Sequence, residues 1–143
     1  MGRLRLRSRT LTAMHILDFH THNPAEPDAI VSGSPMQVVR WLDQYPSAIF
    51  SVGIHPWDTL SQTMQSLSPM LRQLDEIALH PRIVAIGETG LDSLRGAPLE
   101  LQRALLLHHI TLSETIGKPL VLHVVRQQDA ILTLRRHLPA QPR

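Results

Sequence analysis

Short, nearly continuous apolar runs alternate along the chain with segments whose apolar residues recur at helical spacing. The apolar runs occupy residues 15–19, 28–33, 48–54, 82–87 and 118–123. Runs that lack polar alternation are typical of parallel strands covered on both faces, because half-exposed strands alternate apolar and polar residues. The pattern therefore predicts five short, parallel β-strands.

The segments between these runs are predicted to form helices at 37–45, 61–79, 98–116 and 127–138. Pro69 should divide the second helix into two pieces, because proline removes a helix hydrogen bond and clashes with the preceding turn. The third helix has the clearest ends, since Pro98 suits a first turn and Gly117 followed by Pro119 stops it. Regular alternation of strand and helix indicates an α/β fold with a parallel sheet, either open or part of a barrel.

The composition narrows the class of protein. The chain has 143 residues, 43% of them hydrophobic, which suits one globular domain with a real core. It contains no cysteine, so disulfides and thiolate metal ligands are excluded and a reducing compartment, the cytoplasm, is expected. It also lacks a run of about 18 apolar residues, so no membrane-spanning helix is predicted.

Basic residues concentrate in the first thirteen positions, which hold four arginines and no acidic residue. Without them, 14 − 4 = 10 basic residues face 12 acidic ones, so the remaining chain carries a charge of about −2. We interpret residues 1–13 as a disordered extension, with Met14 as an alternative start, and residues 14–143 as the folded domain. The alternative is a basic tail that contacts nucleic acid or a membrane.

Four of the five predicted strands deliver a histidine or a carboxylate at their C-terminal end. His20 and His22 follow the first strand, His55 the third and Glu88 the fourth, and His123 ends the fifth. Residues i and i+2 of a strand point to the same side, so His20 and His22 can aim two imidazoles at one point. Imidazole and carboxylate groups together ligate divalent metal ions. The sequence thus predicts a metal site at the C-terminal edge of the sheet, where barrel enzymes build their active sites.

Each of these signals has a simpler interpretation when taken alone. Two histidines in an H-x-H pattern more often cap, hydrogen-bond or lie on the surface, His55 could be a turn residue before Pro56, and His123 could be a core histidine. Their joint occurrence at strand ends favours the metal site. Four other histidines lie on helices or helix ends and are interpreted as solvated or structural: His80, His108, His109 and His137.

Four stretches in this order resemble the TatD family of metal-dependent hydrolases: DFHTH (18–22), SVGIHPWD (51–58), AIGETGLD (85–92) and PLVLHVVR (119–126). The resemblance runs from about residue 16 to 138, and GIHPWD with GETGLD is its most specific part. It implies a (β/α)8 TIM-type barrel, of which about five of eight strand–helix units are present. It also implies a metal-dependent hydrolase of phosphodiester bonds, typically a deoxyribonuclease, that uses one or two divalent ions such as Mg, Mn or Zn.

The resemblance also implies roles for individual residues. His20 and His22 would hold a first metal ion, Glu88 would bridge or ligate, and His123 would ligate a second ion. Because Glu88 follows a strand expected to be buried, its carboxylate is in any case expected to have a partner.

Three further residues receive roles from the resemblance alone. His55 would line the pocket and contact the scissile phosphate, and Asp92 would order the loop after the fourth strand. Arg126 is a candidate phosphate contact, although it follows His123 by three positions where many relatives have the arginine at two. A DNA substrate is likewise implied by the resemblance and not by charge, because the folded part is slightly acidic.

Family members continue into a sixth strand ending in a ligand histidine and an eighth ending in an aspartate. This sequence ends after the helix that follows the fifth strand. We therefore expect low or absent activity from the chain alone, and self-association through open sheet edges with Leu17, Ile86 and Leu122 exposed. Two alternatives stay open: a non-catalytic remnant that binds metal weakly or packs with a partner, and another H-x-H hydrolase with a small-molecule substrate.

Overall fold

The computed structural model describes residues 18–137 of the chain and, within them, the side chains of residues 21–134. Its sheet consists of β1 (Asp18–Thr21), β2 (Ala29–Gly33), β3 (Ile49–Val52), β4 (Ile83–Asp92) and β5 (Leu120–Val125). Each strand pairs in parallel with the next one in the sequence, so the order in space is β1-β2-β3-β4-β5. A doubly wound sheet reverses this order at a switch point, whereas a barrel wall keeps it.

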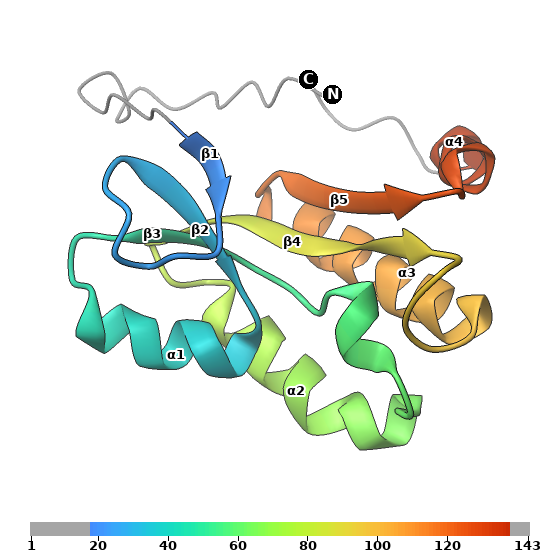
Figure 1. Cartoon of the computed structure of the whole chain (residues 1–143), viewed down its shortest axis with the longest axis horizontal. Helices are drawn as coiled ribbons and strands as arrows, with labels where there is room; N and C mark the ends of the chain where they lie inside the picture. Colours follow the sequence, from blue (N-terminus) through green and yellow to red (C-terminus); the bar gives the residue numbers. More distant parts are fainter. Residues whose placement is uncertain (1–17, 138–143) are drawn as a thin grey trace.

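The helices are α1 (Pro35–Gln44), the short 3-10 helix η1 (Pro56–Thr59), α2 (Met64–Ile77), α3 (Leu99–Ile116) and α4 (Gln128–His137). Figure 1 shows α1, α2 and α3 together on one face of the sheet, with α4 next to the end of β5. The first two strands are joined by the loop 22–28 without a helix. Within the described part of the chain, none of the helices has the length and apolar character needed to cross a membrane.

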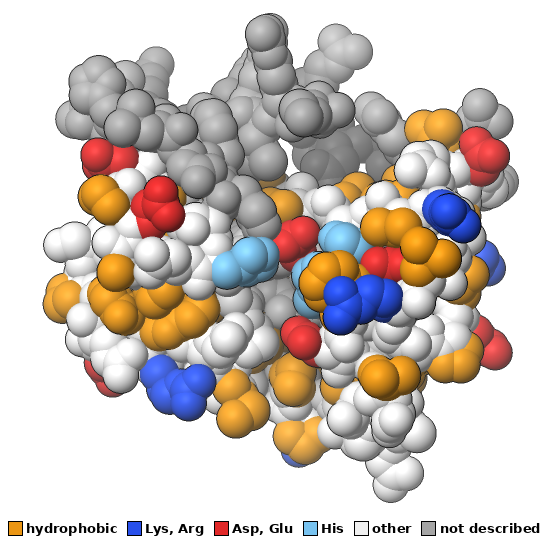
Figure 2. Space-filling view, in the orientation of Figure 1, with side chains coloured by type: hydrophobic (Ala, Val, Ile, Leu, Met, Phe, Trp, Pro, Cys, Tyr) orange, Lys and Arg blue, Asp and Glu red, His pale blue; other side chains and the backbone are white. Residues whose placement is uncertain are grey.

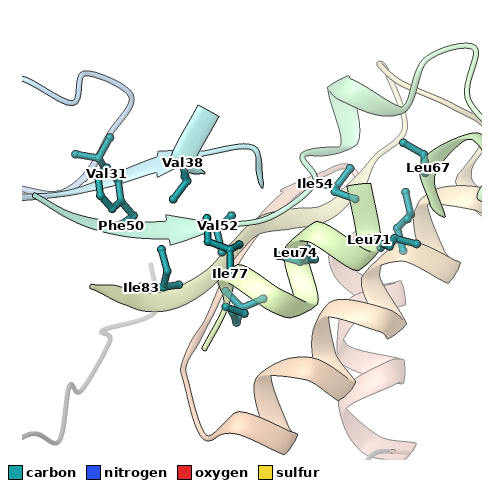
Figure 3. Packing of buried hydrophobic residues seen from close by; sticks show 13 residues of the cluster. Val31, Val38, Phe50, Val52, Ile54, Leu67, Leu71, Leu74, Ile77 and Ile83 are labelled. Atoms are coloured by element: carbon teal, nitrogen blue, oxygen red, sulfur yellow. The ribbon is translucent and has the colours of Figure 1, made fainter. Parts of the chain in front are cut away.

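The main core lies between the sheet and these helices. Phe50 and Val52 of β3 pack there with Leu74 of α2 (Figure 3) and with Leu105 of α3, and all four residues are at most 2% exposed. Burying apolar side chains of this size contributes about 1.5–3 kcal/mol each. This packing fixes the strands against the helices and so positions the strand ends.

Ile86 was predicted to be exposed, and this prediction is wrong, because Ile86 is fully buried in the main core. The pairing of β3 with β4 shifts after Phe50, so one step along β3 matches two steps along β4, from Ile83 to Ala85. This bulge puts Ile83 and Ile86 into the same core cluster, although simple alternation would place them on opposite faces. Leu122 is 42% exposed, as predicted. Leu17 lies outside the described residues.

The predicted break of the second helix at Pro69 is also wrong, since α2 is continuous from Met64 to Ile77. Pro69 lies on the exposed side of the helix, where the carbonyl that loses its N–H partner can be hydrated. On the opposite side, Leu67 and Leu71 belong to one buried stripe that spans the proline. Burial of this stripe holds both halves in line.

Two cationic side chains that lie just before later strands cap the C-terminal ends of earlier helices. Arg82, just before β4, donates to the carbonyl oxygens of Leu42 and Tyr45 at the end of α1. Lys118, just before β5, donates to the carbonyl oxygens of Ala78 and His80 after α2. The last carbonyls of a helix lack intrahelical partners and carry partial negative charge, so these cations stabilise both ends.

The fourth strand extends five residues beyond its predicted end at residue 87, so Glu88 and Asp92 lie within it. Gly87 makes this possible, because a Cβ atom at this position would lie only 2.2 Å from the carbonyl oxygen of Val121. The φ angle of Gly87 is +136°, which residues other than glycine rarely adopt. The backbones of β4 and β5 therefore approach closely beside Glu88.

Candidate metal centre

Side chains from three different strand ends surround the carboxylate of Glu88. Its Oε1 lies 3.6 Å from Nε2 of His22, which follows β1. Its Oε2 lies 3.6 Å from Nδ1 of His123 on β5 and 3.9 Å from Nε2 of His55, which follows β3. Figure 2 shows histidine side chains on both sides of an acidic one at the centre of this face. The structure thus brings together four of the residues predicted from the strand ends.

The hydrogen bonds of His22 and His123 determine which ring nitrogens carry lone pairs. Nδ1 of His22 lies 3.2 Å from the carbonyl oxygen of Ser32, which can only accept, so Nδ1 donates and Nε2 carries the lone pair. Nε2 of His123 lies 3.0 Å from Oδ2 of Asp92, so Nδ1 of His123 carries the lone pair. In both rings the nitrogen with the lone pair is the one directed at Glu88. This is the tautomer that a metal ligand needs.

His55 has the opposite arrangement. Its Nδ1 accepts a hydrogen bond from the backbone N–H of Trp57 at 3.0 Å, so the proton of the neutral ring is on Nε2. Burial lowers the pKa of His55, and this effect outweighs the attraction of Glu88, so the neutral ring is favoured. The nitrogen of His55 that faces Glu88 is therefore a hydrogen-bond donor and not a metal ligand.

Asp92 connects His123 to two neighbouring segments. Its Oδ2 accepts from Nε2 of His123 and, at 2.7 Å, from the indole Nε1–H of Trp57. Its Oδ1 accepts from the backbone N–H groups of Leu94 and Arg95 in the loop after β4. Burial opposes the charged form of this carboxylate, but the hydrogen bonds outweigh burial and hold the pKa of Asp92 well below its usual range.

The spacing of these atoms fits a divalent ion. Ligand atoms about 2.1 Å from a tetrahedral zinc ion lie about 3.4 Å apart, close to the 3.6 Å between Glu88 and each of His22 and His123. These separations are too long for hydrogen bonds. One ligand atom each of His55, Glu88 and His123 lie within 4.8 Å of one another, but the tautomer of His55 removes it from the ligand set. Imidazole nitrogens and a carboxylate suit Mn, Zn and other transition ions.

One predicted site residue with a described side chain, Arg126, is not brought into this cluster. The backbone of His20 lies on β1, two residues before His22, but its side chain is outside the described part. Arg126 is exposed in the turn after β5 with φ of +54°, and it does not line the cavity at the site. For Arg126, the unusual offset from His123 was the signal that its position differs from the family pattern.

The sequence interpretation missed two groups that hold the side chains of the site: the carbonyl of Ser32, which accepts from His22, and the indole of Trp57, which donates to Asp92. A cavity of about 310 Å³ opens beside the cluster. Its lining includes His22, Ser34, His55, Trp57, Asp58 and Glu88. Trp57 could have been found from its place in GIHPWD, two residues after His55, because an indole seldom follows a strand end without a partner for its N–H.

A family model described as TatD related DNase matches residues 13–142. The chain belongs to the TatD family. The resemblance inferred from four short stretches is therefore confirmed over almost the whole chain. The model covers all the residues that surround Glu88.

Two curated TatD proteins illustrate the relationship. A protein of Mycobacterium tuberculosis (strain H37Rv), named metal-dependent hydrolase TatD, is 33% identical over 106 residues, which cover 66% of this chain and 38% of that protein. A protein of Musicola paradisiaca, named 3'-5' ssDNA/RNA exonuclease TatD, is 33% identical over 88 residues, which cover 60% of this chain and 31% of that protein. The chain thus spans less than half the length of these relatives.

A solved structure shares the fold. The crystal structure of YjjV, a TatD homologue from Escherichia coli K12, superposes with a TM-score of 0.60 at 26% identity, over 76% of this chain and 44% of that chain. Together with the consecutive parallel strand order, this confirms the predicted partial (β/α)8 barrel with five strands.

Proposed function

We propose that this chain carries part of the active site of a metal-dependent hydrolase that cleaves phosphodiester bonds in nucleic acid. One observation supports this most strongly. The two oxygens of Glu88 face histidines from different strands, with His22 near Oε1 and His123 near Oε2. A carboxylate held in this way can serve two ions at once, as in two-metal phosphoesterases.

His22, Glu88 and His123 would hold one or two divalent ions, with Mg, Mn and Zn as the candidates, and His20 would join them from β1. When bound, such ions polarise phosphoryl oxygens and make a water molecule a better nucleophile. Asp92 would fix the ring of His123 and, through Leu94 and Arg95, the loop after β4. Partners of this second layer typically account for 10–100-fold in metal affinity.

His55 would bind the substrate and not the metal. Its Nε2–H points toward the same region as Oε2 of Glu88, so it can donate to a phosphate oxygen that lies there. A neutral donor keeps its proton and stabilises the negative charge on the phosphoryl oxygens in the transition state. The role of Arg126 as a phosphate contact also stays a proposal, since its side chain is exposed at the end of β5.

The substrate proposal, DNA or RNA, is supported by the exonuclease name of the Musicola relative. The cytoplasmic location also stays a prediction, and the basic segment 1–13 lies outside the described residues.

Self-association is a further part of the proposal, because β5 ends the sheet among the described strands and exposes Leu122. Edges and apolar side chains of this kind favour pairing with another chain.

The deciding experiment is a calorimetric titration of the full chain with Mn²⁺, followed by hydrolysis of a chromogenic phosphodiester. We expect Glu88→Gln to abolish metal binding and any turnover, because it removes the charge shared by both histidines. Asp75→Asn is the matched control, since this carboxylate contacts only His108 among the histidines described, at 2.8 Å, away from the site. Metal binding without turnover would support the alternative of a non-catalytic, metal-binding chain. Metal binding that survives Glu88→Gln would exclude this site.

A further inference from the structure

An exposed tryptophan lies directly beside the metal centre with an arginine stacked on it. The indole of Trp57 is 43% exposed although its ring centroid lies 4.8 Å from that of His55 and 5.5 Å from that of His123. The guanidinium of Arg95 lies 3.7 Å above the centroid of the indole. In Figure 2, basic and hydrophobic side chains adjoin the histidines at the centre of the face.

Hydrogen bonds hold Trp57 in place, so its exposure does not reflect a mobile side chain. The indole Nε1–H donates to Asp92 at 2.7 Å, and the backbone N–H donates to Nδ1 of His55. A residue held both at its backbone and at its ring N–H presents the ring surface with little conformational entropy left to lose. Such preorganisation increases the affinity for anything that stacks on it.

The side chain of Arg95 is not needed to hold its own loop. The loop 93–97 is anchored by other groups: Asp92 binds the backbone N–H of Arg95, Thr59 Oγ1 accepts from the N–H of Ala97, and Gln102 Nε2 donates to two of its carbonyls. Arg95 itself is exposed. The hydrogen bonds that hold the loop therefore do not explain why the guanidinium of Arg95 stacks on Trp57.

We propose that Trp57 and Arg95 form a stacking platform for an unpaired nucleobase next to the phosphate that enters the metal centre. Aromatic rings and guanidinium planes are surfaces on which proteins stack single-stranded bases. The guanidinium also offers N–H donors to a neighbouring phosphate. The platform rests on the proposed hydrolase function, and it adds where an unpaired base next to the reacting phosphate would lie; paired bases hide their faces and could not use it.

Tryptophan fluorescence tests the platform directly, since the chain has only two tryptophans. The other one, Trp41, is half-buried and stacks on Phe50 at 6.1 Å between ring centroids. In the full chain with Trp41→Phe, a single-stranded decathymidylate should quench the emission of Trp57 saturably at low salt. An abasic strand of equal length and charge should bind at least 5-fold more weakly. The unsubstituted chain should give the same quench above a constant Trp41 background.

Variants at Arg95 separate stacking from charge. Arg95→Lys keeps the charge and Arg95→Gln keeps hydrogen bonding, and we expect both to weaken decathymidylate binding about 5–10-fold without changing the thermal unfolding midpoint. Equal binding of the abasic strand, absence of quenching, or unchanged affinity in both variants would overturn the platform. Chromogenic phosphodiester hydrolysis is measured in parallel. Quenching without hydrolysis would show that this chain alone is not catalytic and would leave the platform standing, whereas hydrolysis without quenching would support the hydrolase function and overturn the platform.

Discussion

Nε2 of His123 lies 3.0 Å from Oδ2 of Asp92, within the same sheet and only one strand apart. Because the pKa of Asp92 is held well below its usual range, this carboxylate stays charged and keeps the imidazole proton on Nε2. The lone pair of Nδ1 is thereby directed at Glu88. Asp92, which is not itself a proposed ligand, thus orients the ring of the proposed ligand His123.

Replacement of this carboxylate should weaken metal binding without unfolding the protein. We expect Asp92→Asn to lower the affinity for Mn²⁺ about 10–100-fold, because the amide cannot hold His123 in one tautomer with the same strength. Calorimetric titration of the full chain measures the change. Asp75→Asn, which removes a carboxylate bonded to His108 outside the site, should leave the affinity within about twofold. A loss as large in Asp75→Asn as in Asp92→Asn would refute the orienting role.

The histidines of the site should differ in tautomer. Nitrogen NMR of the metal-free chain at pH 8 should find the proton of His55 on Nε2 and that of His22 on Nδ1. In line with this, His55→Gln should leave Mn²⁺ affinity within about twofold, whereas His123→Gln should lower it at least 10-fold. If His55→Gln lost metal affinity as strongly as His123→Gln, His55 would be a ligand after all.

The strand positions could be predicted because each strand is a short apolar run, and the chemistry because histidine and glutamate seldom end such runs without a partner. The local geometry that buries Ile86, keeps α2 continuous and makes His55 a hydrogen-bond donor could not be predicted in this way. The bulge that buries Ile86 depends on the pairing of β3 with β4, which leaves no trace in the spacing of apolar residues. The continuity of α2 through Pro69 depends on packing of the opposite face. The tautomer of His55 depends on one backbone N–H of a helical turn that no periodicity reveals.

The buried histidine of α3 makes the protein sensitive to mild acid. His109 is fully buried, accepts from the N–H of Ile54 at 2.9 Å through Nε2, and donates to Leu105 through Nδ1. Burial lowers its pKa from 6.5 to about 4. The unfolded chain therefore binds more protons than the folded protein, so the stabilisation is complete above pH 6.5 and is lost as the pH falls toward 4. We expect the free energy of unfolding to drop by about 1.4 kcal/mol per pH unit in this window.

Urea unfolding of the metal-free chain at pH 7, 6 and 5 measures this loss. His109→Gln is the diagnostic variant, because a glutamine oxygen can still accept from Ile54 but takes up no proton. The difference between the two chains should shrink with falling pH. A constant difference across the range would rule out His109 as the acid-sensitive group.

Removal of the cation that closes α1 should destabilise the fold. Arg82→Met keeps the apolar stem but leaves carbonyls of Leu42, Tyr45 and Ala48 without their charged donor. We expect a loss of about 2 kcal/mol in the free energy of unfolding, the usual cost of losing hydrogen bonds to a charged group. Arg72→Met on the exposed side of α2 is the matched control and should change stability by less than about 0.5 kcal/mol. Equal effects of the two variants would assign Arg82 no special role.

The exposed side chain of Leu122 on β5, the last described strand of the sheet, should cause association in solution. Light scattering of the full chain should report a mass that rises with concentration, and Leu122→Lys should reduce this rise because a charge is costly to bury at an edge. Leu79→Lys serves as control, since Leu79 is 67% exposed after α2, away from the sheet edge. A concentration-independent monomer mass for the unsubstituted chain would contradict this prediction.

The hydrogen bonds of Arg82 and Lys118 to the ends of α1 and α2 also affect when these helices are completed during protein synthesis. Arg82 reaches back 40 residues to Leu42, and Lys118 reaches back 40 residues to Ala78. At a synthesis rate of 5–20 residues per second, each helix end would wait about 2–8 s for its partner to be made. Each of these helix ends is therefore completed only by a residue that is made after the following strand–helix unit, so the growing chain would assemble in steps, from the N-terminal side onward.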